Sequence, residues 1–265
     1  MERQFLIKTA EDFIKNIQDN YITKEIAISD NVAGMRIFDA PIFAFGSADD
    51  DYFALLKQPS VIGEHFLLPK EWLPGAKTVI SFFIPFSKSI VSSNQADESV
   101  SAEWAESYVK TNALINHISE KIIEYLNSIG IKAATIKATH NFDEKTLRAG
   151  WSHRSAAYAA GLGKFGVNRM LITKAGSAGR YGTVIMSQEI TPDERPEEEY
   201  CLYYKNGSCL KCLKACPVNA LSTDGFDRFK CYDRLLDVSK QFTDLGMCDV
   251  CGKCVVSCPL AVIDK

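Results

Sequence analysis

Cysteines carry the clearest chemistry in this 265-residue sequence. All nine lie between Cys201 and Cys258, and none precedes this segment. A Cys-x2-Cys-x3-Cys-Pro motif begins at Cys209 and recurs at Cys251, so that each of its cysteines returns 42 residues later. Duplicated motifs with this spacing are typical of proteins that hold two [4Fe–4S] clusters. The segment therefore predicts two such clusters and single-electron chemistry.

The two motifs also predict which cysteines share a cluster. In a two-cluster ferredoxin, the cysteine that precedes proline ligates the cluster of the other motif. This rule gives two incomplete sets, Cys209, Cys212 and Cys258 in the first and Cys216, Cys251 and Cys254 in the second. Each set still needs a fourth thiolate.

Three cysteines stand outside the motifs and can complete the sets. Cys201 is the only one upstream of Cys209, so elimination assigns it to the first set. For the second set, Cys248 has the regular ferredoxin spacing before Cys251, whereas Cys231 lies between the two motifs. The spacing leaves both open. Zinc held by four thiolates is the alternative metal, but the strict duplication and the Cys-Pro endings favour iron–sulfur clusters.

A second motif, Gly161-x-Gly163-x-x-Gly166, has the form of a dinucleotide-binding loop. Such a loop needs a strand before it and a helix after it. Here a predicted helix over 152–160 precedes it and a predicted strand over 169–173 follows, so the sequence argues against a dinucleotide site. Two interpretations remain: a turn that ends a helix, or a turn that lets the backbone approach a large flat cofactor.

The elements that must position these residues predict an α/β (α+β) fold. An apolar run over 76–85 indicates a central strand, the polar stretch 87–100 indicates a loop, and Thr9 and Ser101 are suitable helix N-caps. Helices are expected over 10–19, 102–129 and 152–160, and strands over 76–85, 131–137, 169–173 and 181–186. The last two strands are expected to close the sheet.

Composition places a boundary before the cysteines. Residues 191–199 contain two prolines and five acids, a composition typical of a linker. We therefore expect an α/β domain over 1–195 and a ferredoxin-like domain over 196–265.

The overall charge and hydropathy exclude several classes of protein. The formal net charge of -3 favours neither a nucleic-acid nor a membrane-surface partner. The first residues lack the features of a signal peptide, and no apolar run approaches the length of a membrane-spanning helix. A cytoplasmic location is the expectation.

The segment 151–190, with its pattern AGLG-x-x-G-x-N-x-x-L-I, resembles the epoxyqueuosine reductases and reductive dehalogenases. In that superfamily a similar segment precedes a two-cluster ferredoxin module. The resemblance implies a nitroreductase-like domain that holds cobalamin against the clusters. It also implies an external electron donor, such as a ferredoxin or flavodoxin, and a corrinoid that reduces the substrate.

The resemblance also implies roles for individual residues. By position, Gly161, Gly163, Gly166 and Asn168 match the segment that lies against the corrinoid. In these families a cysteine between the two motifs serves as a cluster ligand, which favours Cys231 over Cys248.

The sequence departs from the epoxyqueuosine reductases in two ways. Their acidic proton donor stands about 13 residues before the AGLG pattern, where this chain has Leu147. The helical-repeat extension that helps to dock tRNA is also not found after Cys258. We therefore expect a small-molecule substrate rather than tRNA.

Polar residues before the glycine motif are the candidate catalytic groups, namely His153, Arg154 and Tyr158. Helical spacing puts Arg154 and Tyr158 on one face, and each of the three side chains could donate a proton to a developing anion. In the alternative interpretation, Arg154 forms a surface ion pair and Tyr158 belongs to the core.

The sequence thus favours a cobalamin-dependent iron–sulfur reductase. One alternative is a cobalamin-free electron-transfer protein whose α/β domain docks a redox partner. Another is a flavin bound in the nitroreductase-like domain.

Overall fold

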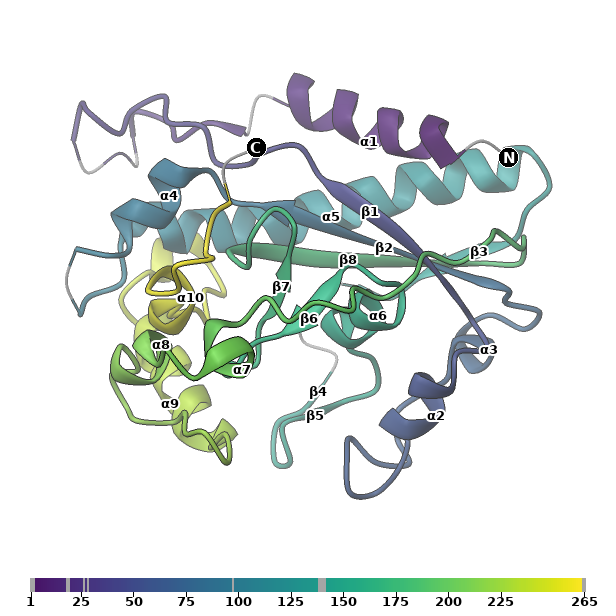
Figure 1. Cartoon of the computed structure of the whole chain (residues 1–265). Coiled ribbons are helices and arrows are strands. Elements are labelled where there is room, and N and C mark those ends of the chain that lie inside the picture. The colour runs from purple at the N-terminus through teal and green to yellow at the C-terminus, as the bar shows by residue number, and fades with distance from the viewer. Residues whose placement is uncertain are drawn as a thin grey trace.

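The computed structural model describes residues 3–17, 20–25, 27, 29–96, 98–137 and 142–263. At its centre lies a four-stranded antiparallel sheet with the order β1–β2–β8–β3 (Figure 1). The strands span Ile42–Ser47 (β1), Thr78–Pro85 (β2), Gly179–Met186 (β8) and Ala133–Thr135 (β3). β2 and β8 pair along their whole length, with Thr78 opposite Met186 and Pro85 opposite Gly179.

The apolar run that predicts a central strand is buried on both faces of this sheet. Every residue of β2 is buried. Ile80, Phe82 and Ile84 contribute to the main core on one face, whereas Val79 and Phe83 belong to two smaller cores on the other. A strand covered on both faces has no solvent side, which is why its sequence is continuously apolar instead of alternating.

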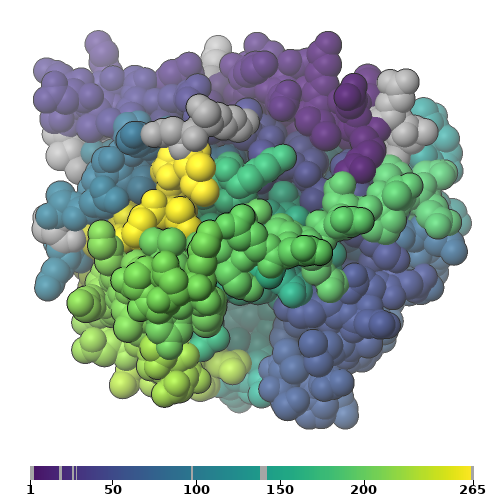
Figure 2. All heavy atoms as spheres, in the orientation of Figure 1, coloured from purple at the N-terminus to yellow at the C-terminus, as the bar shows by residue number. Residues whose placement is uncertain are grey.

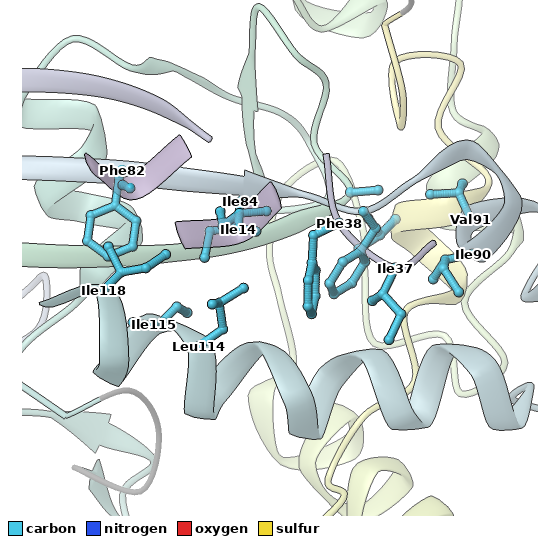
Figure 3. Packing of buried hydrophobic residues seen from close by; sticks show 14 of the residues in the cluster. Ile14, Ile37, Phe38, Phe82, Ile84, Ile90, Val91, Leu114, Ile115 and Ile118 are labelled. Atoms are coloured by element: carbon cyan, nitrogen blue, oxygen red, sulfur yellow. The ribbon is translucent and has the colours of Figure 1, made fainter. Parts of the chain in front are cut away.

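Two helices, α1 (Arg3–Asn16) and α5 (Ala102–Ser128), cover the face of the main core (Figure 1). Figure 3 shows Leu114, Ile115 and Ile118 of α5 beside Phe82 and Ile84 of β2. The predicted cap of α5 is confirmed, because the Ser101 hydroxyl accepts a hydrogen bond from the Trp104 N–H at 3.2 Å.

The opposite face is covered by three short helices, α2 (Asp51–Leu56), α3 (Pro69–Trp72) and α6 (His153–Ala159). The Trp151 ring is 1% exposed and stacks between Phe53 and Phe66, with ring centroids 5.7 Å apart in both pairs. The predicted helix over 152–160 is thus confirmed as α6, with Ser152 as its cap.

Two predictions about local structure were wrong. Residues 87–100 contain a helix, α4 (Lys88–Ser93), because Ser87 caps it and Ile90 and Val91 reach the main core. Helix α1 already includes residue 3, so Thr9 does not cap it. The Thr9 hydroxyl instead donates to the Phe5 carbonyl at 2.9 Å, a bond available inside a helix.

Two hairpins lie outside the main sheet. One consists of β4 (Phe142–Asp143) and β5 (Arg148–Ala149). The other consists of β6 (Gly163–Phe165) and β7 (Leu171–Thr173). The strand predicted over 169–173 therefore pairs with β6 and does not close the main sheet, whereas the strand predicted over 181–186 lies in its interior as part of β8.

The C-terminal part of the chain is built from short helices. They are α7 (Leu202–Asn206), α8 (Lys211–Lys214), α9 (Arg228–Ser239), the 3-10 helix η2 (Thr243–Leu245) and α10 (Lys253–Val256). Val255 and Val256 join the main core, and the Ala178 N–H donates to the Ala261 carbonyl at 2.9 Å. This part of the chain therefore packs directly on the α/β part.

The acidic segment 191–199 has neither helix nor strand, but it is fastened to the α/β part. The Asp193 carboxylate accepts a hydrogen bond from the Phe45 N–H at 2.9 Å and pairs with Arg3. Arg195 forms an ion pair with Asp50. Figure 2 shows the segment, in green, crossing the surface of the molecule. The boundary predicted at residue 195 falls inside this fastened segment.

Within the described residues, no helix combines the length and apolar character that crossing a bilayer requires.

Candidate functional site

The thiols predicted for the first cluster surround one space. Cys201, Cys209, Cys212 and Cys258 all line a cavity with about 340 Å³ of space not filled by protein atoms, part of it open to solvent. They come from the start of α7, from α8 and the residues before it, and from the turn after α10. The pKa of Cys212 is raised to about 11 by burial and then by the neighbouring thiolates of the same set.

A second group of thiols lies beside the first. Burial and then Cys231, Cys251 and Cys216 raise the pKa of Cys254. Burial and then Cys251 and Cys216 raise the pKa of Cys231 to about 11. The second set in the structure therefore contains Cys216, Cys231, Cys251 and Cys254.

Cys248 lies apart from both sets. It is fully buried in a small core with Tyr108, and its thiol donates to the Ala105 carbonyl on α5 at 3.6 Å. Burial and then Asp249, rather than another cysteine, raise its pKa to about 11. Of the two residues that spacing left open, the structure thus brings Cys231 to the second set.

The two sets supply the donors that [4Fe–4S] clusters require, because each offers four thiolates. Within the described part of the chain, no three His, Cys, Asp or Glu side chains gather tightly enough to hold a single metal ion. Four thiols in each of two neighbouring sets are the donors that two such clusters would need.

The glycine motif contains β6, the first strand of the β6–β7 hairpin, and lies in close contact with backbone atoms of the same chain. Gly161 has a φ of +87°, and a Cβ there would lie 2.6 Å from the Glu194 carbonyl oxygen. A Cβ on Gly163 would lie 2.0 Å from the Ile172 carbonyl oxygen. Because α6 precedes the motif, it also lacks the strand that a dinucleotide-binding loop needs, as expected.

The tip of this hairpin contacts both cysteine sets. Asn168 lines the cavity of the first set, and its side-chain N–H donates to the Cys254 carbonyl at 3.2 Å. A Cβ on Gly166 would lie 3.0 Å from the Asn168 side-chain oxygen, which accepts the Met170 N–H at 3.1 Å. The residues matched to the corrinoid segment therefore contact the polypeptide in this structure, and their contact with a corrinoid stays a prediction.

One of the candidate catalytic residues, Arg154, lies near the second set. Arg154 is exposed, and its guanidinium donates to the Arg169 carbonyl at 2.9 Å. The ionisable groups around it include Arg180, Cys254 and Cys231. The α6 helix thus directs a cation from the α/β part towards the second set.

His153 is held by the sheet. Its Nδ1 shares a hydrogen bond with the Thr183 hydroxyl, which also accepts the Trp151 Nε1–H at 3.2 Å. Its Nε2 is buried and, within the described residues, has no hydrogen-bond partner. Burial lowers the pKa of His153 to about 4, the Lys137 backbone opposes this shift, and Arg180 adds to it. His153 is therefore neutral near pH 7.

Tyr158 has a different environment from the other two. Its ring packs against Tyr52 at 4.8 Å and Phe165 at 5.7 Å, and the Arg195 guanidinium lies 5.1 Å from its centre. These contacts join α6 to α2, to β6 and to the acidic segment.

A cluster of polar side chains links the α/β part to the cysteine-rich part, and the sequence did not predict that these side chains lie together. The Arg180 guanidinium lies 4.3 Å from the Tyr108 ring centre and donates to the Asn112 side-chain oxygen at 3.0 Å. The Tyr108 hydroxyl in turn donates to Asp249 at 2.7 Å. Helical spacing identifies Tyr108 as a core residue, and no local signal pairs it with a residue 141 positions away.

Asp143, one of two acids shortly upstream of Leu147, ends β4 and begins the β4–β5 turn. Its carboxylate accepts hydrogen bonds from the backbone N–H groups of Thr146 and Lys145, at 2.7 and 3.1 Å. The bonds from Thr146 hold its pKa below the usual value. Asp143 is therefore a turn-stabilising carboxylate here.

Comparison with known sequences gives a consistent set of relatives, although no family model matches the chain. It is 26% identical to the epoxyqueuosine reductase of Cyclobacterium marinum over 179 residues, which cover 66% of this chain and 54% of the relative. It is 25% identical to the epoxyqueuosine reductase of Francisella cf. novicida over 223 residues, which cover 79% of this chain and 58% of the relative. The chain thus spans about half the length of these curated relatives.

Solved structures agree on the fold. The epoxyqueuosine reductase of Streptococcus thermophilus matches with a TM-score of 0.57 and 20% identity, over 100% of this chain and 68% of that protein. An epoxyqueuosine reductase solved with an epoxyqueuosine-modified tRNA stem loop matches with a TM-score of 0.56 and 22% identity. This match covers 98% of this chain and 65% of that protein.

A more distant match extends the comparison. A reductive dehalogenase, whose structure suggests a mechanism for B12-dependent dehalogenation, gives a TM-score of 0.56 and 16% identity, over 84% of this chain and 30% of that protein. The chain therefore resembles the epoxyqueuosine reductases in sequence and fold, and a reductive dehalogenase in fold, as the glycine motif and the duplicated cysteines predicted.

Proposed function

We propose that this chain is an iron–sulfur reductase that holds one [4Fe–4S] cluster in each cysteine set. The observation that carries the proposal is the grouping of eight of the nine cysteines around two neighbouring sites. The ligands are Cys201, Cys209, Cys212 and Cys258 for one cluster and Cys216, Cys231, Cys251 and Cys254 for the other. Clusters of this kind supply single-electron transfer.

The residues around the sets support a path for electrons through the protein. Cys201 and Cys209 lie in a cavity that is partly open to solvent, which suits the side that an external donor approaches. The second set faces Arg154 and, through Asp249 and Tyr108, the polar group on α5. We propose that the donor is a ferredoxin or flavodoxin and that the substrate is reduced on the Arg154 side.

We further propose a corrinoid beside the second set, between the α/β part and the cysteine-rich part. Support comes from the match to a B12-dependent dehalogenase and from the buried His153 Nε2, which has no partner among the described residues. Arg154 and Arg180 would donate hydrogen bonds to the corrinoid's polar groups or to the substrate. A bound corrinoid supplies a strongly reducing cobalt centre.

The substrate proposed is a small molecule. One solved relative was determined with an epoxyqueuosine-modified tRNA stem loop, so this RNA is the alternative substrate to test. Neither choice affects the assignment of the cluster ligands.

Anaerobic reconstitution with iron, sulfide and hydroxocobalamin tests the proposal. We expect about eight iron atoms and about one cobalt per chain after gel filtration, since two [4Fe–4S] clusters and one corrinoid would be bound. EPR of the dithionite-reduced protein should show signals from both clusters. Zinc in place of iron, or fewer than two clusters, would contradict the central claim.

A cobalamin-free electron-transfer protein is the second candidate, and one observation favours it. The space beside Gly161 and Gly163 is filled by the chain's own carbonyl groups, so packing alone accounts for both glycines. Two clusters without cobalt in the same experiment would select this function. A flavin would instead appear as yellow colour and fluorescence in protein from which the iron has been removed.

A further inference from the structure

The tip of the β6–β7 hairpin, Gly166–Met170, holds Arg154 against the second cysteine set. The turn is closed by the Arg169 N–H, which donates to the Gly166 carbonyl at 2.9 Å. Arg169 itself has a φ of 63°, in the left-handed region that non-glycine residues rarely occupy. The carbonyl of Arg169 accepts a hydrogen bond from the Arg154 guanidinium.

The same turn is anchored to the cysteine-rich part. The Asn168 side chain donates to the Cys254 carbonyl at 3.2 Å and accepts the Met170 N–H at 3.1 Å. The Arg154 guanidinium also lies 3.1 Å from the Met170 sulfur. Arg154 and Cys254 are therefore tied to opposite sides of one tight turn, which fixes the distance between them.

The charge of Arg154 has no carboxylate partner within the described residues. Its hydrogen bonds go to a neutral carbonyl and a thioether, and its ionisable neighbours are Arg180, Tyr181 and the thiols of Cys254 and Cys231. A guanidinium remains protonated in proteins. With a cluster bound, the anions that can balance this charge locally are the thiolates of the second set.

Among the described residues, no cation lines the cavity of the first set, and Lys211, between Cys209 and Cys212 in sequence, is exposed. Apart from the four thiols, its cavity is lined by apolar residues and by the uncharged Asn168. The guanidinium of Arg154, beside Cys254 and Cys231, is therefore a feature of the second set that the cavity lining of the first set does not share. Reduction makes a cluster one charge more negative, so a fixed positive charge nearby stabilises the reduced form more than the oxidised form.

We infer that Arg154 raises the reduction potential of the cluster in the second set above that of the cluster in the first, so that electrons move from the first set to the second. In this inference Arg154 acts through its fixed positive charge and not as the proton donor that the sequence suggested. The transfer is balanced, since one cluster loses the electron that the other gains and an external one-electron donor restores the first. The inference rests on the proposed function, because it requires both clusters.

An EPR-monitored redox titration of the reconstituted full-length chain tests the inference. Arg154→Gln should lower the midpoint potential of one cluster and leave the other unchanged. Arg154→Lys, which keeps the charge, should restore most of the shift. Arg36→Gln removes an exposed arginine that is paired with Asp39 and should move neither midpoint.

The outcomes separate this inference from the proposed function. Two clusters in every variant, with both midpoints unchanged or equally lowered in Arg154→Gln, would overturn the inference alone. A wild-type chain that binds fewer than two clusters would overturn the inference and the proposed function together. Iron content and thermal unfolding of Arg154→Gln establish whether this variant folds, and Arg154→Lys provides the potential measurement in a variant with the native charge.

Discussion

At the scale of single residues, the surroundings of a side chain decide what its chemistry can do. Cys231 and Cys248 have the same thiol, yet one lies among other cysteines and the other against an α5 carbonyl. A cluster ligand must share a site with three other thiolates. Cys248 therefore behaves as a small buried apolar residue.

This difference predicts opposite results for two serine variants. Cys231→Ser should lose about four iron atoms per reconstituted chain, because one cluster loses a ligand. Cys248→Ser should keep the wild-type iron content, since its thiol contacts only protein. Iron and sulfide analysis of both variants, prepared in parallel, checks the assignment. Normal iron in Cys231→Ser together with loss in Cys248→Ser would reverse it.

The lowered pKa of His153 should make the stability of the protein depend on pH. Its folded pKa of about 4 lies below the ordinary value of 6.5, so the unfolded chain binds the proton first as the pH falls. The stabilisation is fully present above about pH 6.5 and is lost as the pH falls towards 4. Between pH 7.5 and 5.5 the loss should be about 1 kcal/mol.

Denaturant unfolding at these two pH values measures the effect. His153→Gln has no titrating group at this position, so its loss of stability between pH 7.5 and 5.5 should be smaller by that amount. Equal losses in the wild type and the variant would show that His153 is not buried in its neutral form.

At the scale of elements, the β6–β7 hairpin joins the α/β part to the cysteines. Its strands approach so closely at Gly163 that a Cβ would meet the Ile172 carbonyl. Its tip then reaches Cys254 through Asn168 and supports Arg154 through Arg169. The glycine motif is therefore needed for packing, whatever cofactor lies beside it.

Gly163→Ala should destabilise the protein by roughly 2–3 kcal/mol or more, because the added methyl overlaps backbone atoms that cannot move alone. Gly225→Ala is the matched control, since its Cβ would find its nearest neighbour, the Ser222 hydroxyl, at 3.8 Å. Chemical denaturation of both variants gives the comparison. Equal stability would mean that the hairpin can open without cost.

At the scale of the whole molecule, the cysteine-rich part has little apolar core of its own. Its buried apolar side chains are few, and Val255, Val256 and Ala261 are buried in the main core of the α/β part. Metal–ligand bonds that form only in the folded chain contribute directly to folding. Bound clusters should therefore stabilise this part strongly.

Iron removal should lower the Tm on the order of 10 °C, since several kcal/mol are lost and each kcal/mol moves the Tm of a chain of this size by about 2–4 °C. Limited proteolysis of the iron-free protein should cut first after residue 199. Calorimetry of matched iron-loaded and iron-free samples provides the measurement. An unchanged Tm would show that packing alone holds the cysteine-rich part.

Much of the fold could be predicted because its signals are local. The apolar run of β2, the Ser101 cap of α5 and the Ser152 cap of α6 act within one element. Helix α4 was missed because its stability comes from Ile90 and Val91 reaching a core built by distant strands. The partner of β7 was missed because strand pairing depends on chain topology.

The sequence by itself predicted the metal chemistry, because the duplicated spacing indicates which thiols can reach a common cluster. Six of the eight proposed ligands follow from that repeat and Cys201 follows by elimination. The spacing left Cys231 and Cys248 open, and the family resemblance favoured Cys231. The tertiary structure groups Cys231 with the second set, which depends on how α9 packs against the second motif. It also placed Arg154 beside this set. Charge–charge distances between segments far apart in sequence are set by packing, which no local pattern records.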